Sequence, residues 1–194
     1  MMLLALLLAL AAGFQQKPAG SATEQMYRSA AASAERKLQH IQENGRRTRP
    51  DQTPTVLTEN EVNAYFASGK VQLPQGVKSV VFHGNRGVID AVARVDFDEI
   101  TAARRSANPL LMLFRGVHDV RVVANAQASG GTAEVHVQSV EIDGVTVPRR
   151  ALEYFIDRYI KPKYPEVGLE SRFKLSHRID TATVGNGELA VTQK

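Results

Sequence analysis

The stretch from Glu134 to Tyr164 constrains the fold most, because a strand, a turn, a helix and a proline stop follow one another within it. Pro148 stands where the helix begins and Pro162 where it ends, since proline fits a first helical turn but disrupts a helix interior. The i, i+3, i+4, i+7 spacing of a single apolar helix face is formed by Leu152, Phe155, Ile156 and Tyr159. The pattern predicts an amphipathic helix that packs against a sheet.

The strand in this stretch forms a predicted hairpin with the strand before it, and the turn lies at Gly130–Gly131. A two-residue turn fixes the register, and the apolar faces of both strands then coincide. The predicted pairs are Ala128 with Ala133, Ala126 with Val135 and Ala124 with Val137. Continued unchanged, this register would turn Glu141 inward, so we expect a β-bulge near Ser139 that re-aims the strand.

One face of the predicted sheet is apolar but shallow, because many of its inward positions are alanine. These alanines are Ala91, Ala93, Ala124, Ala126, Ala128 and Ala133. Such short side chains leave room for a bulky group in an interior that is otherwise close-packed. Two occupants are open at this point: the amphipathic helix after Pro148 or the acyl chain of a ligand, and both could share the space.

A capping box at Ser21 and Glu24 predicts a leading helix that runs to about Asn44. Its apolar face is mostly alanine, so we expect a thinly packed stalk rather than a core element. Residues 46–54 are polar and contain prolines, which predicts a linker. We therefore expect a globular domain over 55–194, preceded by a leader, a helix and a linker over 15–54.

Helices and pairs of strands alternate within 55–194. A second capping box, Thr58 with Glu61, predicts a short helix to about Ser68. Further helices are expected at 100–108 and after Pro148, and further strands at 77–83, 88–98, 173–184 and 188–192. This order predicts an α+β domain with a curved antiparallel sheet built from hairpins and with amphipathic helices packed on one face.

Residues 1–12 are almost entirely leucine and alanine, and residues 9–11 offer the small-x-small pattern of a signal peptidase site. We therefore expect a signal peptide over 1–14 and export to the periplasm or cell envelope. An uncleaved anchor is the alternative, but a dozen helical residues rise only about 18 Å against about 30 Å of hydrocarbon. The chain has no cysteine, which excludes disulfides, thiol nucleophiles and thiolate metal sites.

Residue types common in catalytic and metal sites are present without the spacing that such sites require. The five histidines show no HxxxH or HxH pattern, and the predicted register separates His118 from His136 by about 23 Å. No GxSxG elbow or phosphate-binding glycine loop occurs. Asp90, Asp96 and Asp98 share a strand face with an arginine, which favours a solvated surface. We therefore predict no catalytic residue, no metal and no cofactor.

The net charge of +4 is mild, and part of it is spread over pairs of arginines that are typical of solvated faces. Nucleic-acid binding would need a denser basic stripe with stacking aromatics, so no nucleic-acid partner is expected. The apolar run at 110–114 has two interpretations. It is either a buried strand or helical turn, or an exposed segment in peripheral contact with a membrane. Its residues are Leu110, Leu111, Met112, Leu113 and Phe114.

Three segments carry a resemblance to a known family: 57–63 (LTENEVN), 140–148 (VEIDGVTVP) and 179–191 with its Asn-Gly turn. Through them, residues 55–194 resemble the LmeA-like exported lipid-binding proteins of the tubular lipid-binding (TULIP-like) group. The same residues are also similar to uncharacterised exported bacterial proteins that share this layout. The resemblance implies a strongly curved sheet that wraps a helix and leaves an elongated apolar groove, without identifying the lipid.

Together these expectations describe an exported, non-enzymatic protein that binds lipid or another amphiphile in an apolar groove between helix and sheet, in envelope maintenance or lipid transfer. The expected binding residues are Leu152, Phe155, Ile156, Tyr159, Ala91, Ala93, Ala124, Ala126 and Ala128. The alternative is a ligand-free scaffold or protein-interaction module of the cell envelope, whose groove is filled by its own helix.

Overall fold

The structure is a computed structural model that describes residues 22–102, 115–162 and 164–194. Its helices are α2 (Ala22–Asn44), α3 (Glu59–Ala67), α4 (Phe97–Ala102), α6 (Arg149–Phe155) and the π-helical turn η1 (Ile156–Ile160). Its strands are β1 (Thr55–Thr58), β2 (Val77–Asn85), β3 (Val88–Asp96), β4 (Val117–Ser129), β5 (Thr132–Ile142), β6 (Val145–Thr146), β7 (Glu170–Lys174), β8 (Ile179–Val184) and β9 (Glu188–Gln193). The predicted α+β class is confirmed.

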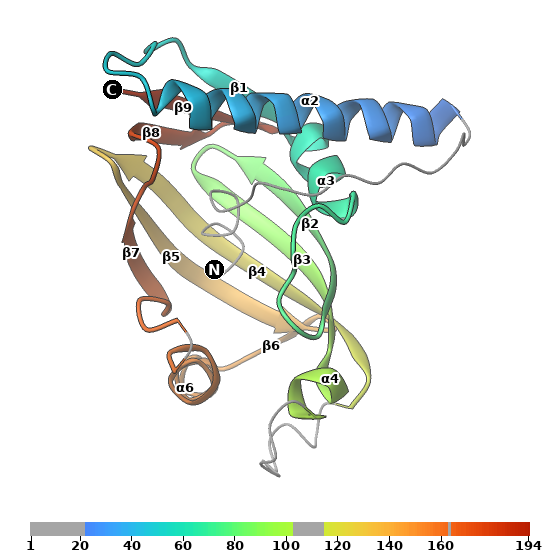
Figure 1. Cartoon of the computed structure of the whole chain (residues 1–194). Helices are drawn as coiled ribbons and strands as arrows, with labels where there is room; N and C mark the ends of the chain where they lie inside the picture. The colour runs from blue at the N-terminus through green and yellow to red at the C-terminus, as the bar shows by residue number, and fades with distance from the viewer. Residues whose placement is uncertain (1–21, 103–114, 163) are drawn as a thin grey trace.

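The strands of the described residues form one open antiparallel sheet that turns a corner (Figure 1). β2, β3, β4, β5 and β7 are neighbours in its long part, and β8, β9 and β1 cross one end of it as a short part. The corner contains a single strand pair, Ala128 with Ala182, and a backbone hydrogen bond from Gly87 N to Val184 O (2.8 Å). One face of the sheet is therefore the inside of the corner.

The β4–β5 hairpin has the predicted register and the predicted bulge. Its pairs include Ala128 with Ala133, Ala126 with Val135 and Ala124 with Val137. The register then shifts, so that Val123 pairs with Ser139 and Gln138 is the extra residue of β5. Beyond the bulge, the Glu141 carboxylate lies 3.8 Å from the Arg121 guanidinium, so the strand has been re-aimed as expected.

Helix α3 begins at the predicted capping box and covers the free edge of β2. Thr58 Oγ1 accepts from Glu61 N (3.2 Å), and Glu61 Oε2 accepts from Thr58 N (2.8 Å). One turn later, the Asn63 carboxamide donates to Phe82 O (2.9 Å) and accepts from Phe82 N (2.8 Å), as a neighbouring strand would. The helix thereby satisfies backbone groups that would otherwise be open to pairing with another chain.

Helix α2 is part of the core, so the expected thin stalk is wrong. Ala30 and Ala31 are buried together with Ala64 of α3, because small side chains let the two helix backbones approach closely. Ala34 and Ile41 are buried in the largest core cluster. The alanines that make the helix look weakly amphipathic in the sequence are therefore its contact surface.

The C-terminal end of α2 is held by two buried amide side chains. Asn44, 1% exposed, donates to Asp51 O (2.8 Å) and to Gln193 Oε1 (2.9 Å) and accepts from Asp51 N (2.8 Å). Gln193 Nε2 donates to Ile41 O (2.8 Å) and to His177 O (2.6 Å). All polar atoms of both side chains are thus paired, and they fasten α2 to β9.

The predicted strand over 173–184 is wrong, because the chain divides it into β7 and β8. His177 and Arg178 between them have φ angles of 54° and 56°, which breaks the extended backbone and lets β8 turn the corner. The strand predicted to end at 98 stops at Asp96 instead, and Phe97 begins α4 with a buried side chain. Most of the helix predicted at 100–108 lies outside the described residues.

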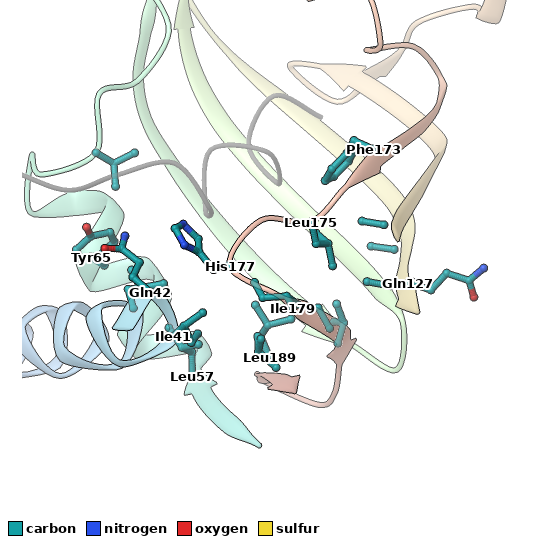
Figure 2. Close-up of a pocket in the computed structure, with 18 of the residues that line it drawn as sticks. Ile41, Gln42, Leu57, Tyr65, Gln127, Phe173, Leu175, His177, Ile179 and Leu189 are labelled. Atoms are coloured by element: carbon teal, nitrogen blue, oxygen red, sulfur yellow. The ribbon is translucent and has the colours of Figure 1, made fainter. Parts of the chain in front are cut away.

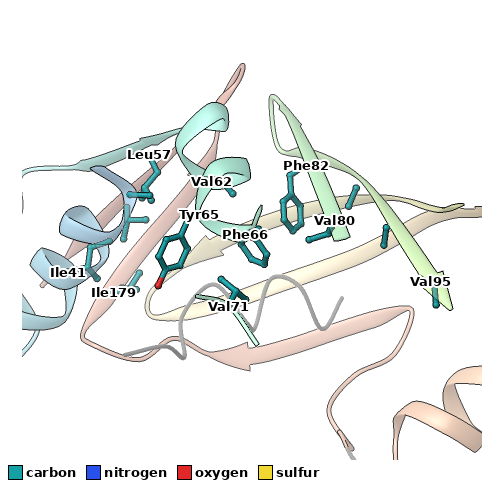
Figure 3. Packing of buried hydrophobic residues seen from close by; sticks show 14 of the residues in the cluster. Ile41, Leu57, Val62, Tyr65, Phe66, Val71, Val80, Phe82, Val95 and Ile179 are labelled. Atoms are coloured by element: carbon teal, nitrogen blue, oxygen red, sulfur yellow. The ribbon is translucent and has the colours of Figure 1, made fainter. Parts of the chain in front are cut away.

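The core fills the space between the inner sheet face and helices α2 and α3 (Figure 3). The rings of Phe66 and Phe82 meet edge to face at 4.9 Å, and Leu57 and Tyr65 belong to the same cluster. A second, smaller cluster is centred on the β4–β5 hairpin and contains Ala124, Ala126, Val135, Val137, Leu169 and Val184. The helices therefore cover the sheet on one face, as predicted.

Candidate functional site

The inner face of the long part of the sheet is apolar on strands β2 to β5. Strand pairing places on this face Val80, Phe82, Ala91, Ala93, Val120, Val122, Ala124, Ala126, Ala128, Ala133, Val135, Val137, Val140 and Ile142. The alanine ladder predicted from the sequence therefore forms. Ala91 and Ala93 are buried in the larger core cluster, and Ala124 and Ala126 in the smaller one.

An apolar cavity of about 70 Å³ lies where α2 and α3 face the corner of the sheet (Figure 2). We call it the alanine cavity, because Ala126, Ala128 and Ala133 form part of its sheet wall. The other apolar lining residues are Leu38, Ile41, Leu57, Tyr65, Phe66, Val71, Phe173, Leu175, Ile179, Ala182, Val184, Leu189 and Val191. The helices supply large side chains and the hairpin supplies small ones, so the space arises on the sheet side.

The lining of the alanine cavity is mostly apolar. Its polar members are Gln42, Gln127 and His177, and it includes no carboxylate from the described part of the chain. The Gln127 side chain is exposed and donates to Glu134 Oε2 (3.2 Å). A binding role for this space would therefore rest on shape and apolar contact.

The structure brings together only part of the predicted binding site. Ala126 and Ala128 line the alanine cavity, and Ala91, Ala93 and Ala124 are packed in the core beside it. Leu152, Phe155 and Ile156 are half-buried at the margins of the two core clusters and do not line the cavity. The side chain of Tyr159 lies outside what the structure describes.

The helix after Pro148 covers the alanine face only at its margin, where Leu152 and Ile156 pack against the cluster of Ala124 and Ala126, and it does not fill the alanine cavity. None of the residues of α6 is buried, and the helix lies at the end of the long strands opposite α2 (Figure 1). It follows β5 and the short β6 directly, so the chain reaches it at that end of the sheet. Over the alanine cavity the covering helices are α2 and α3.

The sequence signal for this cover was present but weak. Leu38 and Ile41 are spaced i, i+3 on α2, and the adjacent aromatic residues Tyr65 and Phe66 lie on the short helix α3. What the spacing could not show is that α2 folds back onto the sheet, since its fastening pair, Asn44 and Gln193, is 149 residues apart.

The acidic residues Asp90 and Asp96 of β3 and Asp98 of α4 each have a different partner. Arg121 donates to Asp90 through Nε (3.0 Å) and Nη2 (2.6 Å), and these hydrogen bonds lower the pKa of Asp90 against the opposing effect of burial. Asp96 lies 3.5 Å from Lys78 Nζ, and Asp98 accepts from Gly116 N (3.0 Å). Within 22–102, 115–162 and 164–194 no cluster of three or more histidine or acidic side chains could hold a metal.

His118 lies between two hydrogen-bond acceptors. Its Nδ1 is 2.6 Å from Asp143 Oδ2 and its Nε2 is 2.9 Å from Arg115 O, so the imidazolium form donates to both. The hydrogen bond to Asp143 raises the pKa of His118, although burial opposes the rise. Asp143 Oδ1 also accepts from Asp119 N (2.9 Å). The pair ties the β5–β6 turn to β4 and does not line the alanine cavity.

No family model, curated protein or solved structure matches the chain. No helix within the described residues is long and apolar enough to cross a bilayer. The expected signal peptide at 1–14 and the apolar run at 110–114 lie outside those residues and stay predictions.

Proposed function

We propose that this chain is an exported, non-enzymatic protein that binds an amphiphile such as a lipid through the alanine cavity and the inner sheet face beyond it. The observation that carries the proposal is an apolar space walled by large side chains of α2 and α3 and by alanines of the β4–β5 hairpin. The resemblance to LmeA-like lipid-binding proteins supports the same ligand class.

The size of the cavity defines how such a ligand would bind. A cavity of about 150 Å³ admits benzene, so 70 Å³ accommodates only the end of an acyl chain. From Ala128 to Val120, the inner side of β4 continues for about 27 Å at 3.4 Å per residue. Along this path Val120, Val122, Val140 and Ile142 are half-buried and apolar. Each CH2 group transferred onto such a surface contributes up to about 0.8 kcal/mol.

The proposal is tested by filling the cavity. In Ala126→Leu, added carbon atoms occupy the space between hairpin and helices, whereas Ala67→Leu adds the same atoms at an exposed position on α3. We expect a long-chain fluorescent fatty acid to bind the wild type and the Ala67 variant equally. Its affinity for the Ala126 variant should be about tenfold lower, which corresponds to about 1.4 kcal/mol. Circular dichroism verifies that both variants are folded.

A ligand-free envelope scaffold or interaction module is the second candidate, and the small volume of the cavity favours it. In that case α2 and α3 complete the core, and the remaining space is a packing defect. Native mass spectrometry of the purified protein separates the two functions. Adducts of lipid mass that are lost in Ala126→Leu support the amphiphile carrier. A bare protein that also fails to take up the fluorescent fatty acid refutes the carrier and leaves the scaffold.

A further inference from the structure

The helix formed by α6 and η1 presents an exposed stripe of two arginines and a tyrosine. Arg150, Tyr154 and Arg158 are spaced i, i+4, i+8, which places them along one side of a helix. All three are exposed, and Tyr154 retains 49% of its surface. The opposite side carries the half-buried Leu152, Phe155 and Ile156. The apolar side of this helix therefore faces the protein, and its cationic and aromatic side faces solvent.

The charges of this helix divide into paired and unpaired groups. Arg149 Nε lies 2.9 Å from Glu153 Oε1, and Lys161 Nζ lies 2.6 Å from Asp157 Oδ1. Arg150 and Arg158 form no ion pair or hydrogen bond through their side chains with any residue that the structure describes. Both acidic groups of the helix are thus engaged by other cations, and the stripe keeps two positive charges for a partner.

A π-helical turn keeps the stripe straight. Lys161 N donates to Ile156 O (2.9 Å), an i to i+5 bond that widens the helix where Arg158 lies. Each residue of such a turn rotates less about the axis than in an α-helix, which reduces the angular offset between Tyr154 and Arg158. Three side chains along an axis that rises about 1.5 Å per residue span about 12 Å.

We propose that the Arg150–Tyr154–Arg158 stripe is a docking surface for an anionic phospholipid bilayer. Arginines that lack a carboxylate partner complement lipid phosphates, and a tyrosine between them suits the boundary between head groups and acyl chains. The other side of the same helix packs against the inner sheet face, where we propose that the amphiphile binds. A bilayer docked on the stripe would therefore lie next to that face, and the inference rests on the proposed amphiphile binding. A docked helix would place the membrane beside the end of the inner sheet face that lies away from α2.

The test is sedimentation of the 194-residue chain with lipid vesicles. Vesicles of phosphatidylcholine alone are compared with vesicles that also contain phosphatidylglycerol, using the wild type and the double variant Arg150→Glu/Arg158→Glu. The matched control is Arg36→Glu/Arg46→Glu, which changes the net charge equally on and just after α2, at the opposite end of the molecule. The same N-terminal segment is present in every protein compared.

We expect the stripe variant to bind anionic vesicles on the order of tenfold more weakly than the wild type, and the control to stay within about twofold, because surface attraction falls off within a Debye length. Arg150→Lys/Arg158→Lys should keep most of the binding, and Tyr154→Ala should lose several-fold. Equal binding of the stripe variant and the wild type, or an equal loss in the control, overturns the docking surface.

Uptake of a monomeric fluorescent fatty acid, measured without vesicles, separates this inference from the proposed function. If the wild type takes up the fatty acid while vesicle binding ignores the stripe, only the docking surface is refuted. If vesicle binding depends on the stripe but no fatty acid is taken up, the docking surface stands and the carrier function falls.

Discussion

Replacement of Glu61 by glutamine tests how α2 and α3 are held together. The Glu61 side chain is 11% exposed, and its carboxylate accepts from Lys37 Nζ (2.7 Å), Ser33 Oγ (2.6 Å) and Thr58 N (2.8 Å). Burial alone would raise the pKa of Glu61, but these hydrogen bonds outweigh it and lower the pKa to about 2. The ionised carboxylate therefore favours the folded state.

The magnitude follows from the difference between the ordinary pKa of 4.5 and the folded value of about 2. At about 1.36 kcal/mol per unit, ionisation of Glu61 stabilises the fold by about 3 kcal/mol at neutral pH. Because the folded pKa is the lower one, this stabilisation is fully present above about pH 4.5 and is lost as the pH falls toward 2. We expect Glu61→Gln to lower the free energy of unfolding by about 3 kcal/mol at neutral pH, and by about half as much near pH 3.

The assay is urea unfolding followed by far-UV circular dichroism at both pH values. Glu35→Gln is the matched control, because the Glu35 carboxylate on α2 also pairs with a lysine, Lys70, but is more exposed than that of Glu61 and should contribute less than about 1 kcal/mol. The reasoning is refuted if both variants lose the same free energy at neutral pH. A loss in Glu61→Gln that does not change between the two pH values would refute it equally.

Three further substitutions test other contacts. Asn44→Ala removes three hydrogen bonds, leaves the buried Oε1 of Gln193 without its partner and should cost about 2 to 4 kcal/mol, seen as a Tm about 5 to 10 °C lower in a thermal melt. Asp143→Asn should lower the pKa of His118 in an NMR titration; since the wild-type pKa is raised, the stability lost in the variant should be largest below about pH 6.5 and vanish at alkaline pH. Gly45→Ala should shift the urea midpoint downward, because a Cβ there would lie 2.2 Å from His177 O.

Local rules were sufficient where neighbouring residues decide the structure. The register of the β4–β5 hairpin follows from a two-residue turn, and the bulge follows from the need to keep Glu141 out of the core. The capping box at Thr58 likewise depends only on residues three apart. Of the predicted binding residues, Ala126 and Ala128 line the cavity, because the register set by the hairpin turn places both on the inner sheet face.

Contacts between distant segments decided the rest. The break at 177–178 uses positive φ at two residues that are not glycine, for which the sequence gives no turn signal. The C-terminal end of α2 is held by Asn44 and Gln193, which are 149 residues apart. From the sequence alone, the alanine face of α2 predicts little burial. The helix at 149–160 has a clear amphipathic pattern, yet it lies at the end of the long strands opposite α2, a position that its local spacing does not specify.

The fastening of α2 connects stability with access to the alanine cavity. Leu38 and Ile41 form part of the helix wall of the cavity, and Ile41 O also accepts from Gln193. A ligand that enters from the side of α2 must lift the helix end and break the contacts of Asn44. Because each hydrogen bond broken in this way costs about 0.5 to 1.5 kcal/mol net, and several must break together, entry by this route would be a rare event in the wild type. Asn44→Ala should then speed fatty acid uptake by about tenfold for every 1.4 kcal/mol by which opening becomes easier, whereas in a ligand-free scaffold it would change stability alone.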